Sequence, residues 1–362
     1  TELDQRTETG LRLAVSENVL NGRDDPSSLR LADGFSRVSP LLAHFPAPLA
    51  QETLEEGITL ILVQPDHPDR GSAVPLRVET IGLDDGQTLL LADPMQVLEP
   101  NADYLVVITD SLVHQDGARV MPTHGTSLAL GLAEPASREE ADLVGYHAPA
   151  RIALREAHIE PTTVVRLWDF TTRSAHDARA PLERMRGASI AAVTEGAVSA
   201  SLTSVEFPAD PAIEMLVVGE LVGVPTFLDE DRGYVVGADG LPEAQGTTRA
   251  PFRVVVPAGT GDYRFVMYGH GTGGNHLDPA FDEDLAAGGI AKVGTRLYGW
   301  TDADVILTFA NLQYMAQGSF AAAGFLVEGL AHAAAIQRAM SGVISDLLAA
   351  DVEKLRRRFG LS

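Results

Sequence analysis

Short apolar runs separated by turn residues dominate the first half of the chain and constrain its fold more than any other feature. The runs are rich in Leu, Ile, Val and Thr and occupy residues 58–63, 74–81, 87–92 and 104–109. Asp84-Asp85-Gly86 and Asp116-Gly117 provide turns between them. Runs of this length with this punctuation are typical of antiparallel strands, so we predict an all-β sandwich.

A helical insertion interrupts this pattern at residues 148–157, where Pro149 is compatible with a first helical turn. A strand over residues 164–171 then closes the domain. We therefore predict a first domain over residues 1–172. The charged segment that follows has only a thin apolar stripe, which predicts a helical connector over residues 173–197.

The second half begins with strand-like runs at residues 198–207 and 215–224. Its most informative part is residues 252–274, where two apolar runs lead into the glycine-dense sequence 269–274 (GHGTGG). A loop at the end of a strand is a common place for chemistry. We predict a second domain over residues 198–362 with a mostly parallel sheet.

The glycines in this sequence suit a loop whose backbone N–H groups point at a developing negative charge. Glycine allows unusual backbone conformations and close approach to a substrate, and α/β-hydrolases take part of their oxyanion hole from a loop after a strand. We expect the amides of Gly271 and Thr272 to be the donors. His270 is expected to brace the loop through its ring hydrogen bonds, because the general base comes later in the chain order of that fold.

Two other interpretations of the glycine loop stay open. Its spacing formally matches the G-x-G-x-x-G pattern of dinucleotide-binding loops. However, residues 275–279 (NHLDP) follow it instead of a helix, and no Lys-Ser/Thr pair ends it as in a P-loop. The loop could also be a purely structural turn.

Both halves of the chain resemble a group of bacterial proteins in which an immunoglobulin-like (Ig-like) domain precedes a secreted lipase-like hydrolase. In the first half, the resemblance is carried by the phrases at residues 31–49, 98–120 and 168–172. In the second half, it is carried by residues 227–257, 268–278 (YGHGTGGNHLD), 292–300 (KVGTRLYGW) and 325–340.

This resemblance implies an α+β multidomain chain: an Ig-like β-sandwich followed by the N-terminal part of an α/β-hydrolase domain. It implies a serine hydrolase acting on carboxylic esters, an esterase or lipase that is secreted, periplasmic or associated with the outer surface. Its partners would be an ester or lipid substrate.

The resembling proteins carry a G-x-S-x-G nucleophile elbow after the matching region, whereas no such motif occurs in these 362 residues. Residues 351–362 are expected to be the helix end and loop before the strand that bears it. The Ser/Asp/His triad would then lie in absent sequence or in a second polypeptide that carries the rest of the hydrolase domain. The alternative is a non-catalytic cell-surface binding scaffold.

Aromatic residues after the glycine loop, Tyr298 and Trp300, either line an acyl pocket and contact substrate or fill the core. His332 is expected to be a packed histidine rather than a base. Ser319 lacks the flanking pattern of an elbow.

Composition excludes several classes of function. The net charge of −23 repels nucleic acid, and the absence of cysteine excludes disulfides and a thiolate nucleophile. The histidines do not form a metal-binding pattern, and the acids at 278 and 282–284 are interpreted as helix-start residues rather than calcium ligands. We expect no metal and no cofactor. No apolar stretch approaches the ~20 residues that a membrane span needs.

Overall fold

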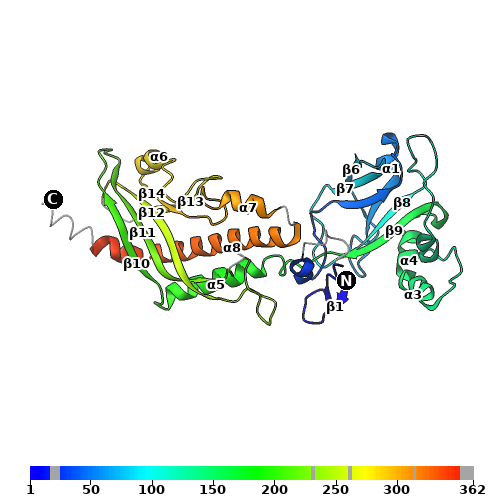
Figure 1. The fold of residues 1–362 in the computed structure, drawn as a ribbon, viewed down its shortest axis with the longest axis horizontal. Helices are drawn as coiled ribbons and strands as arrows, with labels where there is room; N and C mark the ends of the chain where they lie inside the picture. Colours follow the sequence, from blue (N-terminus) through cyan, green and yellow to red (C-terminus); the bar gives the residue numbers. More distant parts are fainter. Residues whose placement is uncertain (17–24, 230–232, 260–262, 313–314, 351–362) are drawn as a thin grey trace. The chain divides into compact units, whose positions relative to one another are not determined.

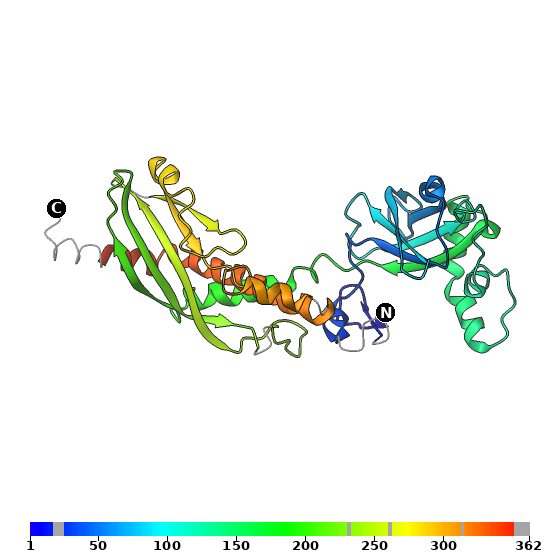
Figure 2. The same ribbon diagram turned by 45° about the horizontal axis from the view of Figure 1, so that its top comes forward.

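The computed structural model describes residues 1–16, 25–229, 233–259, 263–312 and 315–350. Two compact units emerge from its contacts (Figures 1 and 2). The first comprises Thr1–Ala14 and Ala32–Ala178, and the second comprises Val15–Leu31 and Arg179–Ser362. The expected helix end and loop at 351–362 lie outside the described residues.

Two antiparallel sheets form the body of the first unit. One has the order β3-β7-β6 and the other β5-β4-β8-β9. Their bounds are β3 Leu41–Phe45, β4 Ile58–Leu62, β5 Ala73–Val74, β6 Leu76–Gly82, β7 Thr88–Pro94, β8 Asp103–Thr109 and β9 Val164–Thr171. A small β1–β2 pair, Glu2–Leu3 with Leu11–Arg12, precedes them. The predicted strands of this half are thus confirmed within a few residues.

The four-stranded sheet is buried on both faces. Leu60 and Val106 contribute to a core shared with the three-stranded sheet. Their neighbours Ile61 and Val107 point to the opposite face, where they pack with Leu154 of helix α4. Because a strand buried on both faces needs apolar residues at every position, β8 reads as one continuous apolar run.

Helices cover part of the first unit. Helix α4 (Ala148–Glu156) is confirmed at its predicted place. The helices α2 (His124–Ala129) and α3 (Arg138–Tyr146) were not predicted, although each begins with a side-chain cap, from Thr123 and Ser137. Shorter elements are η2 Pro26–Leu31, which belongs to the second unit, η3 Gln51–Thr53, α1 Leu54–Gly57 and η4 Pro161–Thr163.

The second unit contains a sheet of order β10-β11-β12-β14-β13. The bounds are β10 Ser199–Glu206, β11 Ile213–Thr226, β12 Gly246–Pro257, β13 Arg264–Gly269 and β14 Ile290–Thr295. Of these neighbours, only β13 and β14 pair in parallel. The expectation of a mostly parallel sheet is therefore wrong for the described residues. The physical reason is that β10, β11 and β12 follow one another as a meander, whereas a parallel pair needs a crossover connection.

Helices lie on both faces of this sheet. The long α8 (Met315–Met340) packs its Ala335 and Ile336 against Phe252 and Val293 of the sheet. The opposite face receives α6 (Asp282–Ala287), whose Ala286 packs with Val255. A further helix, α7 (Val305–Asn311), precedes α8 (Figure 1). The described chain is a mixed α+β protein with several antiparallel sheets.

Helix α5 (Ala180–Thr194) lies where a connector was expected, but it packs within the second unit. Its Met185 is fully buried with Phe227 and with Ala331 of α8. The segment therefore contributes to a core instead of only joining two domains.

Residues Ala316–Met340 of α8 are long and apolar enough to cross a membrane by length and composition, with a mean hydropathy of 1.5. This corrects the expectation that no apolar stretch approaches that length. The most apolar window of this segment is 56% buried inside the protein. Its hydropathy is thus accounted for by core packing.

Candidate functional site

The glycine loop begins at the end of the parallel strand pair. Gly269, the last residue of β13, pairs with Thr295, the last residue of β14. Carboxyl ends of parallel strands meet at one edge of a sheet, where α/β proteins usually place their ligands. The loop after β13 and the loop after β14 therefore start side by side.

Hydrogen bonds join these two loops. The Gly273 amide donates to the Trp300 carbonyl at 2.8 Å, and the Gly274 amide donates to the Gly271 carbonyl at 3.0 Å. Gly273 has a φ of +76°, a conformation that favours glycine. At Gly274, an added Cβ would lie 3.0 Å from the Cβ of His270. The backbone conformation thus favours glycine at 273, and a side chain at 274 would press on His270.

His270 is buried and both of its ring nitrogens are engaged. The Leu297 amide donates to Nε2 at 3.0 Å, so Nε2 is the acceptor. Nδ1 must then carry the proton, and it donates to the Gly271 carbonyl at 2.9 Å. The ring connects the glycine loop to the loop after β14, which is the geometry that bracing requires. No ring nitrogen is left to act as a base.

The amides of Gly271 and Thr272 lie on an exposed part of the loop. Within the described chain neither N–H group donates a hydrogen bond to a protein acceptor. Both are therefore available to an external acceptor, whereas the amides of the next two glycines are already used.

Tyr298 and Trp300 have different surroundings. The Tyr298 hydroxyl donates to the Arg249 carbonyl at 3.0 Å. The Tyr298 ring lies edge-on to the His332 ring, with 5.4 Å between the ring centres. Burial raises the pKa of this phenol. Trp300 is partly buried. Its ring packs near that of Phe309 on α7, with 6.0 Å between the ring centres. Tyr298 and Trp300 are both partly buried, so each keeps some exposed surface.

A buried ionic cluster lies beneath the loop and was missed by sequence reasoning. Lys292 on β14 is 1% exposed, and its Nζ donates to Asp282 Oδ1 at 2.8 Å and to the carbonyls of Asp278 and Ala280. The carboxylate of Asp282 also accepts two hydrogen bonds from Arg253. The cluster attaches the segment after the glycine loop to the sheet.

The only sequence signal for this cluster was a cation inside each of two apolar runs, FRVVVP and IAKVGT. A buried cation needs a partner, so a paired acid could have been expected. Its identity could not, because Asp282 is distant in sequence from Arg253. The carboxylate of Asp282 is occupied in this way, whereas that of Asp278 accepts from the Tyr268 hydroxyl and the Ala280 amide. Among the described residues no group of His, Cys, Asp or Glu could hold a metal ion.

Asp278 and His276 complete the surroundings of the loop. The Tyr268 hydroxyl donates to Asp278 at 3.0 Å, and a hydrogen bond from the Ala280 amide helps to lower the pKa of this carboxyl. Burial lowers the pKa of His276, helped by the positive charges of Arg296 and Arg253. Nδ1 of His276 is buried without a hydrogen-bond partner in the described part of the chain.

The loop after β14 is held by a second carboxylate. Asp304 accepts hydrogen bonds from the Thr301 hydroxyl at 2.7 Å and from Arg296 at 3.1 Å. Burial alone would raise the pKa of Asp304, but these hydrogen bonds and the charge of Arg296 lower it overall. The loop that receives the Gly273 hydrogen bond is therefore itself fixed.

His332 is a packed histidine, as expected. It is almost fully buried, its Nε2 lies 3.1 Å from the Pro225 carbonyl, and burial lowers its pKa. Glu328, one turn earlier on α8, accepts hydrogen bonds from the Thr226 hydroxyl and the Phe227 amide. Ser319 lies within helix α8, so it cannot form the strand-to-helix turn of an elbow.

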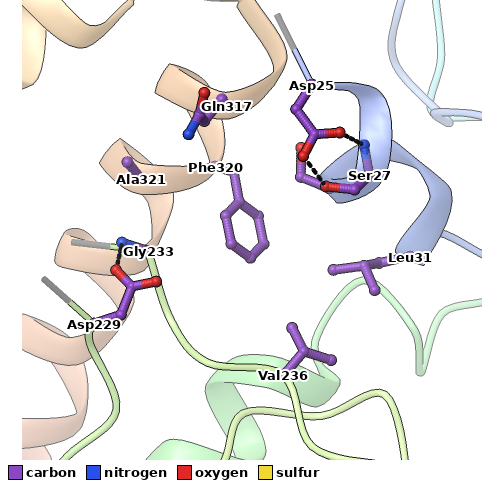
Figure 3. Close-up of a pocket in the computed structure, with 10 residues that line it drawn as sticks. Asp25, Ser27, Leu31, Asp229, Gly233, Val236, Gln317, Phe320 and Ala321 are labelled. Atoms are coloured by element: carbon purple, nitrogen blue, oxygen red, sulfur yellow. Dashed lines mark hydrogen bonds between the residues drawn. The ribbon is translucent and has the colours of Figure 1, made fainter. Parts of the chain in front are cut away.

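A cavity of about 330 Å³ lies elsewhere in the second unit (Figure 3). Asp25 and Ser27 of the η2 region line one side, Asp229 and Gly233 another, and Phe320 of α8 lies between them. The Asp25 carboxylate accepts hydrogen bonds from Ser27, and Asp229 accepts one from the Gly233 amide. The glycine loop does not contribute to its lining.

Comparison with known proteins adds no relationship. No family model matches the chain. No curated protein sequence matches it either.

Proposed function

We propose that this chain supplies the oxyanion loop of a serine hydrolase that acts on carboxylic esters. The observation that carries the proposal is the pair of exposed, unpartnered amides at Gly271 and Thr272, held in a loop that His270 ties to its neighbour. Both amides are open to an external acceptor, which an oxyanion hole requires.

In the proposed reaction a serine oxygen would bond to the ester carbonyl carbon while its proton passes to a histidine base, and the carbonyl oxygen would become negative in the tetrahedral intermediate. Collapse of that intermediate would break the bond to the alcohol, which leaves with the proton from the histidine. The amides of Gly271 and Thr272 would donate to the negative carbonyl oxygen. Each preorganised donor of this kind typically contributes about 3 kcal/mol to the transition state. Because His270 is in hydrogen bonds at both nitrogens, the general base must be another histidine.

The serine, its base and its acid would be supplied by sequence outside this chain or by a second polypeptide. The proposal also assigns a fold to each unit. The second unit would be the N-terminal part of an α/β-hydrolase domain, and the first unit would be an Ig-like module. The parallel β13–β14 pair with a loop at its carboxyl end supports the former. The shared core of two antiparallel sheets supports the latter. The location would be extracellular, periplasmic or at the outer surface.

The half-buried Trp300 is the proposed acyl contact. Its carbonyl accepts the Gly273 hydrogen bond, so the backbone of Trp300 lies beside the glycine loop. An apolar ring at this place would favour an ester with a hydrocarbon acyl group.

A serine-directed fluorophosphonate probe tests the proposal. The protein is incubated with the probe as purified, and the intact masses of all polypeptides in the denatured sample are then measured. We expect a probe adduct on a polypeptide or segment that carries a G-x-S-x-G serine. If a sample that includes a G-x-S-x-G segment or polypeptide together with this chain shows no species with the added probe mass, the proposal is contradicted.

Variants at Thr272 test whether the backbone amide of this residue speeds the labelling reaction. Thr272→Pro removes the backbone donor, and we expect labelling to slow about 100-fold. Thr272→Ala keeps the N–H group and removes only the side chain, so it should label like the parent. Equal rates for all three proteins would show that this amide is not a donor.

A non-catalytic binding scaffold is the second candidate. It is favoured by the absence of G-x-S-x-G from these 362 residues. A protein that remains unlabelled but folded would make this candidate the better one.

A further inference from the structure

A cavity of about 440 Å³ lies in the first unit, where the proposed reaction assigns no residue. Its lining comes from residues 48–52 between β3 and α1, from the β6–β7 hairpin, and from Gln115 after β8. All of the residues that line it lie in the described part of the chain. Its volume falls within the range of about 300–1,000 Å³ that small-molecule sites occupy.

Amide and hydroxyl side chains supply most of the polar lining of this cavity. They belong to Gln51, Thr80, Gln87, Thr88 and Gln115. The Gln51 amide group donates to the Thr80 hydroxyl at 2.7 Å, and the Gln87 amide group donates to the Asp85 carboxylate. These contacts orient both amides and leave their carbonyl oxygens available as acceptors. The lining can therefore both donate and accept hydrogen bonds.

Thr88 provides the strongest indication of a ligand. This residue of β7 is 3% exposed and pairs with Phe45 of β3 and with Gly82 of β6. Its hydroxyl makes no hydrogen bond within the described residues, yet it is not among the atoms that are fully enclosed without a partner. The small accessible surface of Thr88 thus includes the hydroxyl, and the residue lines the cavity. Because buried polar groups are normally hydrogen-bonded, this hydroxyl points to a group of the ligand.

The charges of the cavity select a neutral ligand. No lysine, arginine or histidine occurs among the described residues that line it, and Glu52 carries a negative charge. The net charge of −23 on the whole chain also opposes an anion. An ammonium or guanidinium ion has donors only, so it would leave the amide hydrogens of the lining without acceptors. Neither ion matches the cavity.

A sugar ring meets these requirements. Each of its hydroxyl groups both donates and accepts, and Glu52 can accept from them. The C–H groups of the ring can pack on the apolar part of the lining, which consists of Pro48, Leu49, Ala50 and Leu83. A peptide is a poorer match, because its N–H donors and C=O acceptors are separate groups at fixed spacing.

We infer that this cavity of the first unit binds a neutral hexose, either as a free sugar or as the end of a glycan. Thr88 and the glutamine amides hold its hydroxyl groups, and Glu52 accepts from them. The inference rests on the first unit alone and does not depend on the reaction proposed for the second.

Saturation-transfer difference NMR with the full chain tests this inference. The probes are the methyl glycosides of glucose, galactose and mannose, with the disaccharides maltose, cellobiose and lactose. We expect at least one of them to bind with a Kd below about 10 mM. The matched anionic controls are the uronates of the same three hexoses, which should bind at least about tenfold more weakly. A neutral acetylated tripeptide of glycine and serine is the peptide control.

Three results of this experiment would overturn the inference. The first is that no neutral sugar binds below about 10 mM. The second is that a uronate binds as well as its hexose, because the cavity would then not discriminate against a negative charge. The third is that the tripeptide binds more tightly than every sugar, because the cavity would then take a peptide.

Thr88→Val shows whether the sugar binds in this cavity, because it removes the hydroxyl and keeps the shape of the side chain. We expect it to raise the Kd about 3- to 10-fold, as the loss of one hydrogen bond does. The thermal unfolding temperature should stay close to that of the parent, because the hydroxyl has no partner within the described residues to lose. Unchanged sugar binding in a folded Thr88→Val protein would overturn the inference.

A second pair of variants keeps the test decisive if Thr88→Val does not fold. Glu52 and Glu55 are both exposed and lie close in sequence, but only Glu52 lines the cavity. Glu52→Ala should weaken sugar binding at least about threefold, whereas Glu55→Ala should leave it unchanged. Equal effects of the two substitutions would overturn the inference.

Discussion

Lys292 places a cation in the interior of the second unit, and its ammonium group has an acceptor for each of its three protons. It also lies 4.2 Å from the centre of the Tyr268 ring. Without Lys292 the carbonyls of Asp278 and Ala280 would lose a buried donor, and each acceptor left unsatisfied costs about 1–3 kcal/mol. Lys292 is therefore a point where a single side chain decides the stability of the region around the glycine loop.

We expect Lys292→Met to lower the free energy of unfolding of the second unit by about 2–4 kcal/mol, because two buried carbonyls lose their donor. The measurement is urea unfolding followed by Trp300 fluorescence in a Trp168→Phe background. Arg184→Met is the matched control, because Arg184 pairs with Asp239 at the surface, with both side chains 51% exposed. An exposed pair of this kind contributes less than about 1 kcal/mol. If both variants lose a similar free energy of unfolding, the buried cluster contributes no more to stability than the surface pair.

Acid should destabilise the second unit through its buried histidines. Burial lowers the pKa of both His276 and His332. The unfolded chain, with histidine pKa values of about 6.5, then binds more protons than the folded chain at mildly acidic pH. The free energy of unfolding is therefore highest above the pKa that these histidines have in the unfolded chain. It falls as the pH decreases below about 6.5.

Urea unfolding at several pH values between about 8 and 5.5 measures how the free energy of unfolding depends on pH. We expect a smaller loss on acidification in His332→Gln than in the parent, because the glutamine does not titrate. A parent protein that becomes more stable toward pH 5.5 would contradict the assignment of neutral, buried histidines.

At the scale of elements, Gly294 lies inside strand β14 at a point where the loop after β13 comes very close. This close approach explains why the position is a glycine. A Cβ at Gly294 would lie 2.5 Å from the His276 carbonyl oxygen, which belongs to the backbone and cannot easily move. By contrast, a Cβ at Gly271 would meet nothing within 4 Å. Gly271 is also absent from the residues with positive φ.

We therefore expect Gly294→Ala to destabilise the second unit by about 1–3 kcal/mol through overpacking. Gly271→Ala should change the free energy of unfolding by less than about 0.5 kcal/mol. Thermal unfolding of the two variants beside the parent provides the comparison. A larger loss for Gly271→Ala would mean that the loop is more tightly packed than its contacts indicate.

At the scale of the whole molecule, the chain contains two tryptophans, one in each compact unit. Trp168 lies in β9 of the first unit, and Trp300 lies in the loop after β14 of the second. Trp168→Phe and Trp300→Phe thus give proteins in which fluorescence reports one unit at a time. Units with separate cores are expected to unfold separately.

We expect the two single-tryptophan proteins to show unfolding transitions at different urea concentrations. Adding Lys292→Met should shift the transition reported by Trp300 and leave that reported by Trp168 in place. If both transitions shift together, the two units unfold as one cooperative structure.

Local patterns alone determined much of the secondary structure of this protein. The strands β4, β8 and β9, the helix α4 and the strand before the glycine loop all lie within a few residues of their predicted places. Apolar runs of strand length and turn residues have local physical causes, so a single sequence carries them. The requirement for glycine at 273 is local too, because it follows from a positive φ.

Tertiary structure alone decided the order of the strands and the partners of the buried charges. A local pattern does not state whether neighbouring strands run parallel, so the mostly antiparallel sheet contradicted the expectation. The pairing of Arg253 and Lys292 with Asp282 likewise depends on strand register and on the placement of α6.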